Sequence, residues 1–480
     1  MIGLLASVLD EGASAAIDGR VIVYRVSLFV ASLLFLVGLR MLTNPETARR
    51  GMQMAVVGMA LGVVGTLVHH DIVSYHWIIG GLVVGTVIGI PMGLLIPMTK
   101  MPERIALSHA GGGLAVALVG IAEYLAGHPQ EHGKFAMGSV TFEIIMGAIT
   151  FTGSLMAFGK LAELLPGKPM TFPGQNAMNV LLLAGALGLL VVLVLHPHLP
   201  VLFYLLVGVS LILGVLLVLP IGGADMPVVI CLLNSYAGLA ASASGFALDN
   251  NVLIICGALD GGSGLILALI MSKAMNRSFA NVLFGAFGSD AAAAAGGAGK
   301  GGNVREGTPE DAAELLKIAQ SVIIVPGYGM AVAQAQHATR DLATALAANG
   351  TNVRYAIHPV AGRMPGHMNV LLAEANVPYD QLFELDAINE EFERTDVSIV
   401  VGANDVVNPA AKTSPGSPIF GMPILNVDKS KAVIVLKRSM KPGFAGIENE
   451  LFVLPQTMMV FGDAKQTLGK ITAAMKGGGH

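Results

Sequence analysis

Nine long apolar segments in the first 272 residues restrict this chain more than any other feature of its sequence. A helix needs about 20 apolar residues to cross a bilayer, because each residue advances it by about 1.5 Å. Only 12% of the 480 residues are charged, about half the share usual in soluble domains. These features predict a multi-span α-helical membrane domain. Its helices are expected at about residues 23–43, 51–69, 76–98, 105–126, 139–165, 176–195, 199–220, 226–247 and 251–272.

The remaining segments differ in composition from this domain. Residues 273–305 are rich in glycine and alanine, so we expect a linker there. Residues 306–480 have the pattern of an ordinary soluble α/β domain. Residues 1–22 are expected to form an extracytoplasmic segment, and they lack the basic start and long apolar core of a signal peptide.

Lysine and arginine near the ends of the apolar segments predict the orientation, since cytoplasmic loops carry more of them. Counted in alternate loops, one side has nine such residues and the other has three. The larger set is Arg40, Arg49, Arg50, Lys100, Arg104, Lys160, Lys168, Lys273 and Arg277. The smaller set is Arg20, Arg25 and Lys134. We therefore expect the N-terminus outside and the α/β domain in the cytoplasm.

Polar side chains within the apolar segments are candidates for function, because each is costly in hydrocarbon. The set comprises His109, Ser154, Asn234, Glu143 and Asp260, with Asp225 and Arg277 at the cytoplasmic edge. Helix–helix hydrogen bonds, interface positions or helix caps are the alternative, and for any single serine or asparagine they are the favoured interpretation. An imidazole titrates near physiological pH. His109 is therefore as much a candidate proton site as a packed polar residue.

The soluble half alternates apolar strands with helices. The strands are expected in SVIIV, NVRYAIH, LFELD, VSIVVGAND, KAVIVLKR and MMVFGD, between residues 321 and 463. A long helix is expected from Met330 to Gly350, a second over HMNVLLAEA and a last one from about Ala464. Six strands alternating with helices predict a doubly wound, Rossmann-like parallel sheet.

The turn after the first strand is a candidate nucleotide loop. Gly327 and Gly329 form G-x-G between a strand and a helix, where the backbone can approach a pyrophosphate. The third position of the usual motif is not glycine, although Ala331 and Ala333 are small. The strand, the helix and their spacing support the interpretation.

Charged residues at the strand ends distinguish the two nicotinamide nucleotides. A common NAD site has an acidic residue after the second strand, but His358 and Pro359 occupy that place. Lys437 and Arg438 end a later strand, and two cations suit a 2′-phosphate, hence NADP. A solvated strand end is the alternative for this pair. Asp405 follows another strand and is either an N-cap or a functional carboxylate.

Two classes of partner are disfavoured by composition. The net charge of -4 gives no basic surface for nucleic acid. Cys231 and Cys256 lie in apolar runs, which favours packed thiols over a disulfide or a metal site, and no metal is expected.

Segments along nearly the whole chain resemble the beta subunit of proton-translocating nicotinamide nucleotide transhydrogenases. In the soluble half they are PGYGMAVAQAQ, GANDVVNPAA, KRSM and FGDAK; in the membrane half they are FTGSLMAFGKL, IGGADMPVVI, LNSYAG and KAMNRSF. The resemblance implies NADP(H) on this chain and NAD(H) on a separate alpha subunit, made of one chain or two. It implies hydride transfer between the nicotinamides coupled to one proton crossing the bilayer. It also implies a bacterial cytoplasmic (inner) membrane and a dimer of such heteromers.

The resemblance further implies which residues bind the nucleotide. They are Gly327, Tyr328, Gly329, Met330, Ala331, Val332, Ala361, Gly362, Arg363, Met364, Pro365, Gly366, Gly402, Ala403, Asn404, Asp405, Asn408, Lys437, Arg438, Ser439, Asp463 and Ala464. The nucleotide would lie reversed relative to most dinucleotide folds, with Lys437 and Arg438 on its 2′-phosphate. Relatives often have tyrosine where this chain has Phe444, so a hydroxyl contact is not expected there.

Residues of the membrane half receive roles from the same resemblance. His109 matches the proton-carrying histidine, with Ser154 and Asn234 as its polar partners. Asp225 and Arg277 match residues that link the membrane to the soluble domain. We expect protonation of His109 to switch the NADP(H) domain between an open and an occluded state. Asp405 would sense the state of the nucleotide.

Two other functions fit part of the sequence. A transporter or channel with a redox-sensing nucleotide domain would need no NAD(H)-binding partner. It predicts an acidic residue after the second strand, where none occurs. A membrane-anchored NADP reductase does not account for nine spans with internal polar residues.

Overall fold

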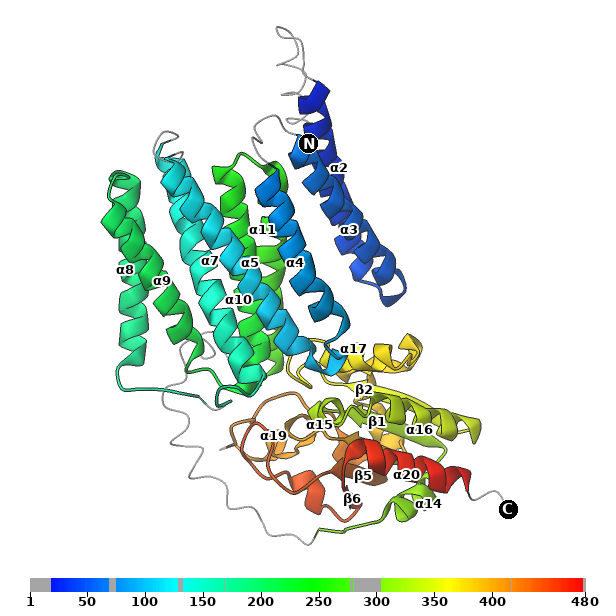
Figure 1. The fold of residues 1–480 in the computed structure, drawn as a ribbon. Helices are drawn as coiled ribbons and strands as arrows, with labels where there is room; N and C mark the ends of the chain where they lie inside the picture. Colours follow the sequence, from blue (N-terminus) through cyan, green and yellow to red (C-terminus); the bar gives the residue numbers. More distant parts are fainter. Residues whose placement is uncertain are drawn as a thin grey trace.

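The chain forms a helical bundle that lies against an α/β domain, as Figure 1 shows. The computed structural model describes residues 19–68, 75–127, 133–167, 169–276, 279, 304–415 and 417–477. Most of the two expected segments 1–22 and 273–305 lies outside these residues. The fold class predicted from sequence, a membrane bundle with a Rossmann-like domain, is confirmed.

Within the described residues, nine helices are long and apolar enough to cross a membrane. They are α2 (Gly19–Leu42), α3 (Pro45–Val68), α4 (His76–Leu94), α5 (Met101–Ala126), α7 (Lys134–Leu161), α8 (Gln175–Leu195), α9 (Pro200–Val218), α10 (Met226–Ala247) and α11 (Asn251–Ala274). The expected end of α7 at residue 165 is wrong. The helix ends at Leu161, and soon after it Glu163 has a left-handed φ of 59° that a helix cannot continue through.

Helices α7 and α10 form the centre of the bundle and are its most buried spans. Glycines allow their neighbours to approach closely. A Cβ at Gly147 of α7 would lie 2.9 Å from the backbone nitrogen of Ala117 in α5. A Cβ at Gly238 of α10 would lie 2.3 Å from the nitrogen of Gly261 in α11. Small residues at crossing points are the usual basis of helix association in a bilayer.

Helix α4 is exposed along its whole length in this chain. None of its residues is buried, and its apolar side chains include Trp77, which is 79% exposed. In Figure 1, α2 and α3 likewise form a hairpin set apart from the centre of the bundle. Such faces require lipid or another chain against them.

A parallel sheet in the order β3-β2-β1-β4-β5-β6 forms the centre of the soluble half that the structure describes. The strands are β1 (Ser321–Pro326), β2 (Asn352–Ile357), β3 (Leu382–Glu384), β4 (Val397–Val401), β5 (Ala432–Lys437) and β6 (Thr457–Phe461). All six lie in the segments expected from sequence, except that β1 ends and β6 begins one residue outside them. The order reverses between β1 and β4, and the carboxyl ends of strands at such a switch point form a crevice for ligands.

Different elements cover the two faces of this sheet. One core includes residues of α14 (Pro309–Ile318), α16 (Gln336–Ala348), α17 (His367–Glu374) and α20 (Ala464–Lys476). The other core is closed by short helical turns and loops, through residues such as Phe392, Val407 and Phe452. The short turns leave room for several loops to meet at the carboxyl edge.

The single helix expected from Met330 is wrong. The chain forms α15 (Tyr328–Val332), then a break, then α16. Gln334 lies in the break with a left-handed φ of 49°. The periodic pattern of small residues continues through it, so hydropathy alone could not reveal the interruption.

The two halves of the chain touch at the ends of α7 and α11. Arg363 of the soluble half donates to the carbonyl oxygen of Leu161 at 2.6 Å and pairs with Glu163 at 2.9 Å. The side chain of Asn276 donates to the carbonyl oxygen of Phe420 at 2.8 Å. Val360 of the soluble half packs against the first turns of α10 and the last turns of α11.

Candidate functional site

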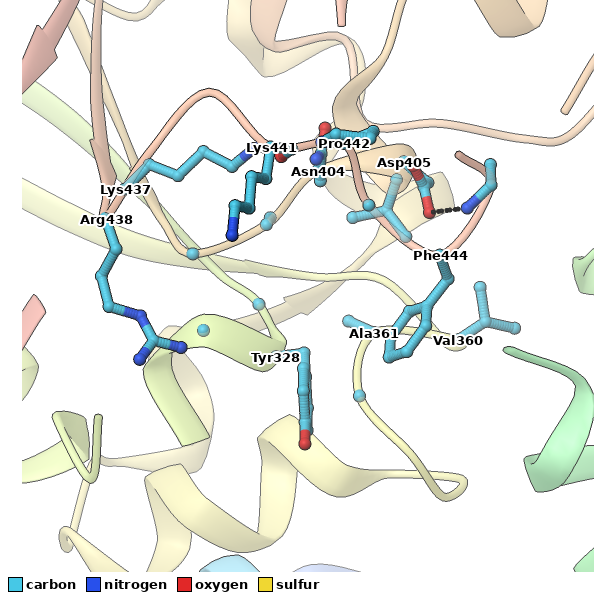
Figure 2. Close-up of a pocket in the computed structure, with 18 of the residues that line it drawn as sticks. Tyr328, Val360, Ala361, Asn404, Asp405, Lys437, Arg438, Lys441, Pro442 and Phe444 are labelled. Carbon is cyan, nitrogen blue, oxygen red and sulfur yellow. Dashed lines mark hydrogen bonds between the residues drawn. The ribbon is translucent and has the colours of Figure 1, made fainter. Parts of the chain in front are cut away.

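A cavity of about 800 Å³ opens at the carboxyl ends of β1, β4 and β5. Loops after these strands form its walls, and Met275 at the end of α11 reaches it from the membrane half. Figure 2 shows Lys437, Arg438 and Lys441 on one side, with Asp405 and Phe444 on the other. Its size lies within the range of about 300–1,000 Å³ found for small-molecule sites.

Glycines bring two of these loops into backbone contact. The nitrogen of Gly329 donates to the carbonyl oxygen of Gly402 at 2.9 Å. A Cβ at Gly327 would lie 2.3 Å from the Cα of Ala403, and Gly402 itself has a φ of +64°. The G-x-G turn is therefore required for loop packing, in addition to any approach of a phosphate.

Cations gather where β5 ends. Lys437, Arg438 and Lys441 line the cavity. The Lys437 ammonium donates to the carbonyl oxygen of Lys441 and lies 4.9 Å above the ring of Phe452. Burial lowers the pKa of Lys437, while the nearby Asp405 carboxylate opposes that shift. Such a cluster is suited to a phosphate group.

Asp405 lies across the cavity from these cations. One carboxylate oxygen accepts a hydrogen bond from the nitrogen of Ala445 at 3.0 Å. The other oxygen is buried without a hydrogen-bond partner among the described residues. Burial raises the pKa of this carboxyl group, although backbone donors and Lys437 act in the opposite direction. An under-bonded buried carboxylate can receive a donor from a ligand.

Tyr328 connects the cavity to the membrane half. Its ring lines the cavity, and the Arg363 guanidinium lies 4.4 Å from the ring centroid in a cation–π contact. Burial raises the pKa of the Tyr328 phenol to about 12, so it stays protonated. Because Arg363 also binds the end of α7, one guanidinium contacts both halves.

Two buried histidines shape the loop that carries Arg363. His358 hydrogen-bonds the carbonyl oxygen of Pro423 at 2.8 Å, and its other ring nitrogen accepts from Val360. His367 accepts from the backbone nitrogen of Arg363 at 3.1 Å. Burial lowers the pKa of each histidine to about 4. Both rings are therefore neutral at physiological pH.

The polar residues of the membrane half lie on three neighbouring helices. His109 is on α5, Ser154 on α7 and Asn234 on α10. The Nδ1 atom of His109 and the Oγ atom of Ser154 are buried and lack hydrogen-bond partners in the described part of the chain. Asn234 donates to the Asp260 carboxylate at 3.0 Å, and Asp260 lies within electrostatic range of His109. Asp260 of α11, which the sequence named only as a polar candidate, therefore lies beside His109 and Asn234.

The chain is similar to known proteins along most of its length. Residues 24–474 match the model of a protein family described as NAD(P) transhydrogenase beta subunit. Two Rhodospirillum rubrum proteins named NAD(P) transhydrogenase subunit beta are 51% identical to this chain over 455 residues, which are 93% of this chain and 97% of theirs. The chain belongs to the NAD(P) transhydrogenase beta subunit family. It is a membrane-protein subunit of an oxidoreductase complex that uses NAD(P)(H), with an alpha subunit as partner.

The transhydrogenase residues expected at the nucleotide divide into two groups. Those that line the cavity are Gly327, Tyr328, Gly329, Ala361, Gly362, Gly402, Ala403, Asn404, Asp405, Lys437, Arg438, Ser439 and Ala464. Those that lie outside its lining are Met330, Ala331, Val332, Arg363, Met364, Pro365, Gly366, Asn408 and Asp463.

Several members of the second group have supporting contacts. Met330 and Ala331 are packed in the core of the sheet domain. Asn408 is fully buried and binds the carbonyl oxygen of Glu448. Asp463 is the N-cap of α20. These residues position the loops that form the cavity.

The segment from Lys441 to Ala445 lines the cavity but was not among the residues predicted to bind the nucleotide, although Phe444 was noted as a difference from relatives. The sequence did contain a signal, because KRSMKPGFAG has a third cation and a Pro-Gly turn directly after Lys437 and Arg438. Met275, Pro418, Ile419 and Met422 also line it. They come from two segments, the end of α11 and residues 418–422, and only the tertiary fold brings these together.

The two residues expected to link the halves differ in what can be said of them. Asp225 is the N-cap residue of α10 and is 9% exposed, at the end of the bundle nearest the soluble half. Arg277 lies outside the described residues.

Proposed function

We propose that this beta subunit binds NADP(H) in the cavity at β1, β4 and β5. The three cations Lys437, Arg438 and Lys441 carry this assignment, because they would neutralise a 2′-phosphate that NAD(H) lacks. The residues after β2 supply no carboxylate for a free ribose hydroxyl, since His358 and Pro359 follow it.

The residues present fit the whole dinucleotide. The cations suit the phosphate end, while Tyr328, Ala361 and Phe444 offer apolar surface farther along the cavity (Figure 2). The bare oxygen of Asp405 would accept a hydrogen bond from an amide such as the nicotinamide carboxamide. Asp405 would thereby sense whether a nucleotide is bound. The other predicted residues, from Met330 to Asp463, would support these loops.

The reaction would be reversible hydride transfer between NAD(H) on the alpha subunit and NADP(H) on this chain. Bound nicotinamide supplies the hydride chemistry, so no side chain of this chain has to carry it. The loops of this chain would hold the ring, exclude water and control access by the partner. We also propose that two such heteromers form a dimer in the lipid bilayer.

We propose that a proton crosses through the membrane half by way of His109, with Ser154 and Asn234 as polar partners. Two buried polar atoms, on His109 and Ser154, have no hydrogen-bond partner in the part of the chain that the structure describes, and they support this role. One charge crossing 100 mV is worth about 2.3 kcal/mol. That exceeds the 1.4 kcal/mol of a tenfold shift in an equilibrium, so a membrane potential can drive hydride toward NADP.

Arg363 is the proposed route by which the halves communicate. It binds the carbonyl oxygen of Leu161 seven residues after Ser154 on α7, and it also covers Tyr328 in the cavity. A shift at the end of α7 would therefore move a residue that contacts the nucleotide site. Asp225 and Arg277 would complete the link.

The membrane is proposed to be the bacterial cytoplasmic membrane, with the N-terminus outside. The asymmetry of nine against three cations in alternate loops supports this orientation. It leaves the nucleotide cavity in the cytoplasm, where both nicotinamide nucleotides occur.

Reconstitution tests this function directly. The chain and an alpha subunit from the same source would be inserted into vesicles, and transfer from NADH to an NADP analogue followed together with internal pH. We expect transfer and a pH change to occur together. Hydride transfer with constant internal pH contradicts the coupling. Equal affinity of the chain for NADPH and NADH contradicts the nucleotide assignment.

A further inference from the structure

Glu143 is an ionisable group within α7 that the proposed function does not use. Its side chain is fully buried. One carboxylate oxygen accepts from the Ser244 hydroxyl of α10 at 2.5 Å, while the other is buried without a partner among the described residues. A Cβ at Gly120 of α5 would lie 3.2 Å from the Glu143 carboxyl carbon. Glycine at that position therefore makes room for the carboxyl group.

The depth of Glu143 distinguishes it from an ordinary helix-end residue. It lies 18 residues before Leu161, where α7 meets the soluble half. At a rise of about 1.5 Å per residue this is about 27 Å. It also lies nine residues, about 14 Å, after Lys134 at the other end. Glu143 is thus inside the span, in the half remote from the nucleotide cavity. An ionisable group there is costly and generally functional.

Glu143 lies at the same interface as His109, the seam between helices α5 and α7. Helices α5 and α7 pack antiparallel, with Gly113 against Phe151, Gly147 against Ala117 and Gly120 against Glu143. This register sets His109 level with Ser154, and Gly120 level with Glu143. On each helix these two levels are eleven residues apart, from 109 to 120 on α5 and from 143 to 154 on α7. Eleven residues are about three turns, or about 16 Å, so both levels share one helix face.

The groups between the two levels include a hydroxyl. Thr150 is fully buried on the same face of α7, and its hydroxyl reaches toward the carbonyl oxygen of Leu233 in α10. Beside it, Gly147 and Ala117 bring the backbones of α5 and α7 into contact. That contact leaves no room for a side chain between α5 and α7, whereas the Thr150 hydroxyl faces α10.

We infer that Glu143 receives the translocated proton on the side of the membrane remote from the nucleotide cavity and passes it toward His109. This rests on the proposed coupling of hydride transfer to proton movement. The bare carboxylate oxygen gains one proton from water on that side and forms an O–H bond. It returns to the carboxylate when the proton moves on, through hydroxyls and water, to a ring nitrogen of His109. The reverse sequence applies when the flow reverses.

The neighbours of Glu143 suit reversible protonation. From α5, the Glu123 carboxyl group lies within electrostatic range of Glu143. From α10 comes the neutral Ser244 hydroxyl, which can turn to accept from the acid or donate to the carboxylate. A carboxyl group with two such neighbours does not form a permanent ion pair.

A purely structural role is the competing explanation. The bond between Glu143 and Ser244 would then only hold α7 to α10. Glu143→Gln preserves volume and hydrogen bonding but cannot titrate. Ser244→Ala is the matched control, since it removes the hydrogen bond and leaves the carboxyl group. A structural role predicts that Ser244→Ala is at least as harmful as Glu143→Gln.

The experiment uses the complex with its alpha subunit in vesicles. We expect Glu143→Gln to slow proton translocation at least tenfold and to flatten its dependence on the pH of the remote side. We expect Ser244→Ala to slow it less than threefold. Infrared difference spectra between two values of that pH should contain a carboxylic acid band that Glu143→Gln removes. Wild-type translocation by Glu143→Gln, or an unchanged infrared band, overturns the inference.

Two further outcomes remain decisive. Hydride transfer without proton movement in the wild-type complex contradicts the proposed function and this inference together. A coupled wild-type complex with a coupled Glu143→Gln variant contradicts this inference alone.

If Glu143→Gln does not assemble, Glu143→Asp replaces it, because that variant still titrates. We expect Glu143→Asp to shift the pH profile, and a profile identical to wild type overturns the inference.

Discussion

Two carboxylates, one in each half of the molecule, have opposite surroundings. Asp396 at the amino end of the sheet accepts from the backbone nitrogens of Gln320 and Ser321 and from Lys431 at 2.8 Å. The hydrogen bond from Lys431 is the main reason that its pKa is lowered to about 2. Glu143 in the membrane half accepts one side-chain hydrogen bond, from Ser244, and among the described residues its other carboxylate oxygen has no hydrogen-bond partner.

The number of hydrogen-bond donors around each carboxylate separates structural acids from functional ones. A carboxylate with several donors is fixed as an anion and ties strands together. A buried carboxylate with an unused oxygen can accept a proton or a ligand donor. The soluble half repeats the contrast at the carboxyl edge of its sheet. There, one oxygen of Asp405 has no hydrogen-bond partner among the described residues, and burial raises the pKa of its carboxyl group. In both halves the under-bonded acid lies where function is proposed.

The largest effect is expected from removing the titratable group in the membrane half. His109→Ala should lower proton translocation by about 100-fold or more, the scale of losing a positioned acid–base group. NADPH affinity of the soluble half should stay within twofold of wild type, because the cavity is untouched. Translocation in vesicles and NADPH binding would be measured on the same preparation.

The exposed His196 supplies the control for this variant. His196→Ala should leave both quantities unchanged. If His109→Ala kept full pumping, the division between a proton-carrying half and a nucleotide-binding half would lose its main support.

Titration in the soluble half should affect folding instead. His358 and His367 have pKa values lowered to about 4 by burial, against an ordinary value of 6.5. Their stabilising contribution is therefore complete above pH 6.5 and is lost as the pH falls toward 4. At pH 5 each should cost about 2 kcal/mol of the free energy of unfolding.

Calorimetry between pH 8 and pH 5 measures this loss on the intact chain. His358→Gln and His367→Gln should each flatten the pH dependence of the transition assigned to the sheet domain. A pH dependence that is the same in both variants and in wild type would show that other groups control acid unfolding.

The sheet domain was largely predictable because its signals are local. Each strand is a short apolar run followed by a turn, and the cations Lys437 and Arg438 are adjacent to such a run. Parallel strands expose their carboxyl ends on one edge, so the loops could be assigned to one site. The break at Gln334 was missed because its immediate neighbours Ala333 and Ala335 favour helix, and no glycine or proline marks the interruption.

The membrane half was predictable as helices but only partly as a site. Hydropathy gives each span, yet it contains little information on how the spans rotate against one another. The register of α5 on α7 depends on contacts such as Gly113 against Phe151. Without that register, Glu143 and Asp260 could be named as unusual polar residues but not placed relative to His109. The partners of Arg363 at the end of α7 could not be predicted for the same reason.

Charge at the cavity should matter less than the proton site but in a specific way. Lys437→Met should weaken NADPH binding about tenfold, the usual order for one charge-assisted contact, and should leave NADH binding unchanged. Lys431→Met at the opposite end of β5 is the control, because Lys431 pairs with Asp396 far from the cavity. Equal weakening of NADPH and NADH would argue against a 2′-phosphate beside Lys437.

The smallest effect is expected at the contact between the halves. Glu163 is 75% exposed, whereas its partner Arg363 is 13% exposed. Exposed ion pairs contribute about 0–1 kcal/mol, so Glu163→Gln should change NADPH affinity and proton translocation only about twofold. The change should disappear at high salt, which screens exposed charges. Glu393→Gln, which breaks another exposed pair with Lys429, is the control and should change neither quantity.

The reason for so small an effect is that Arg363 keeps its second contact. In Glu163→Gln the Arg363 guanidinium still donates to the backbone carbonyl oxygen of Leu161, because the substitution does not change that group. If Glu163→Gln had a tenfold effect, the exposed carboxylate of Glu163 would be the main link between the halves, and the carbonyl of Leu161 would contribute little. A twofold effect leaves the backbone of α7 as the principal connection, so a movement of that helix end would reach Tyr328 without any change in charge at the interface.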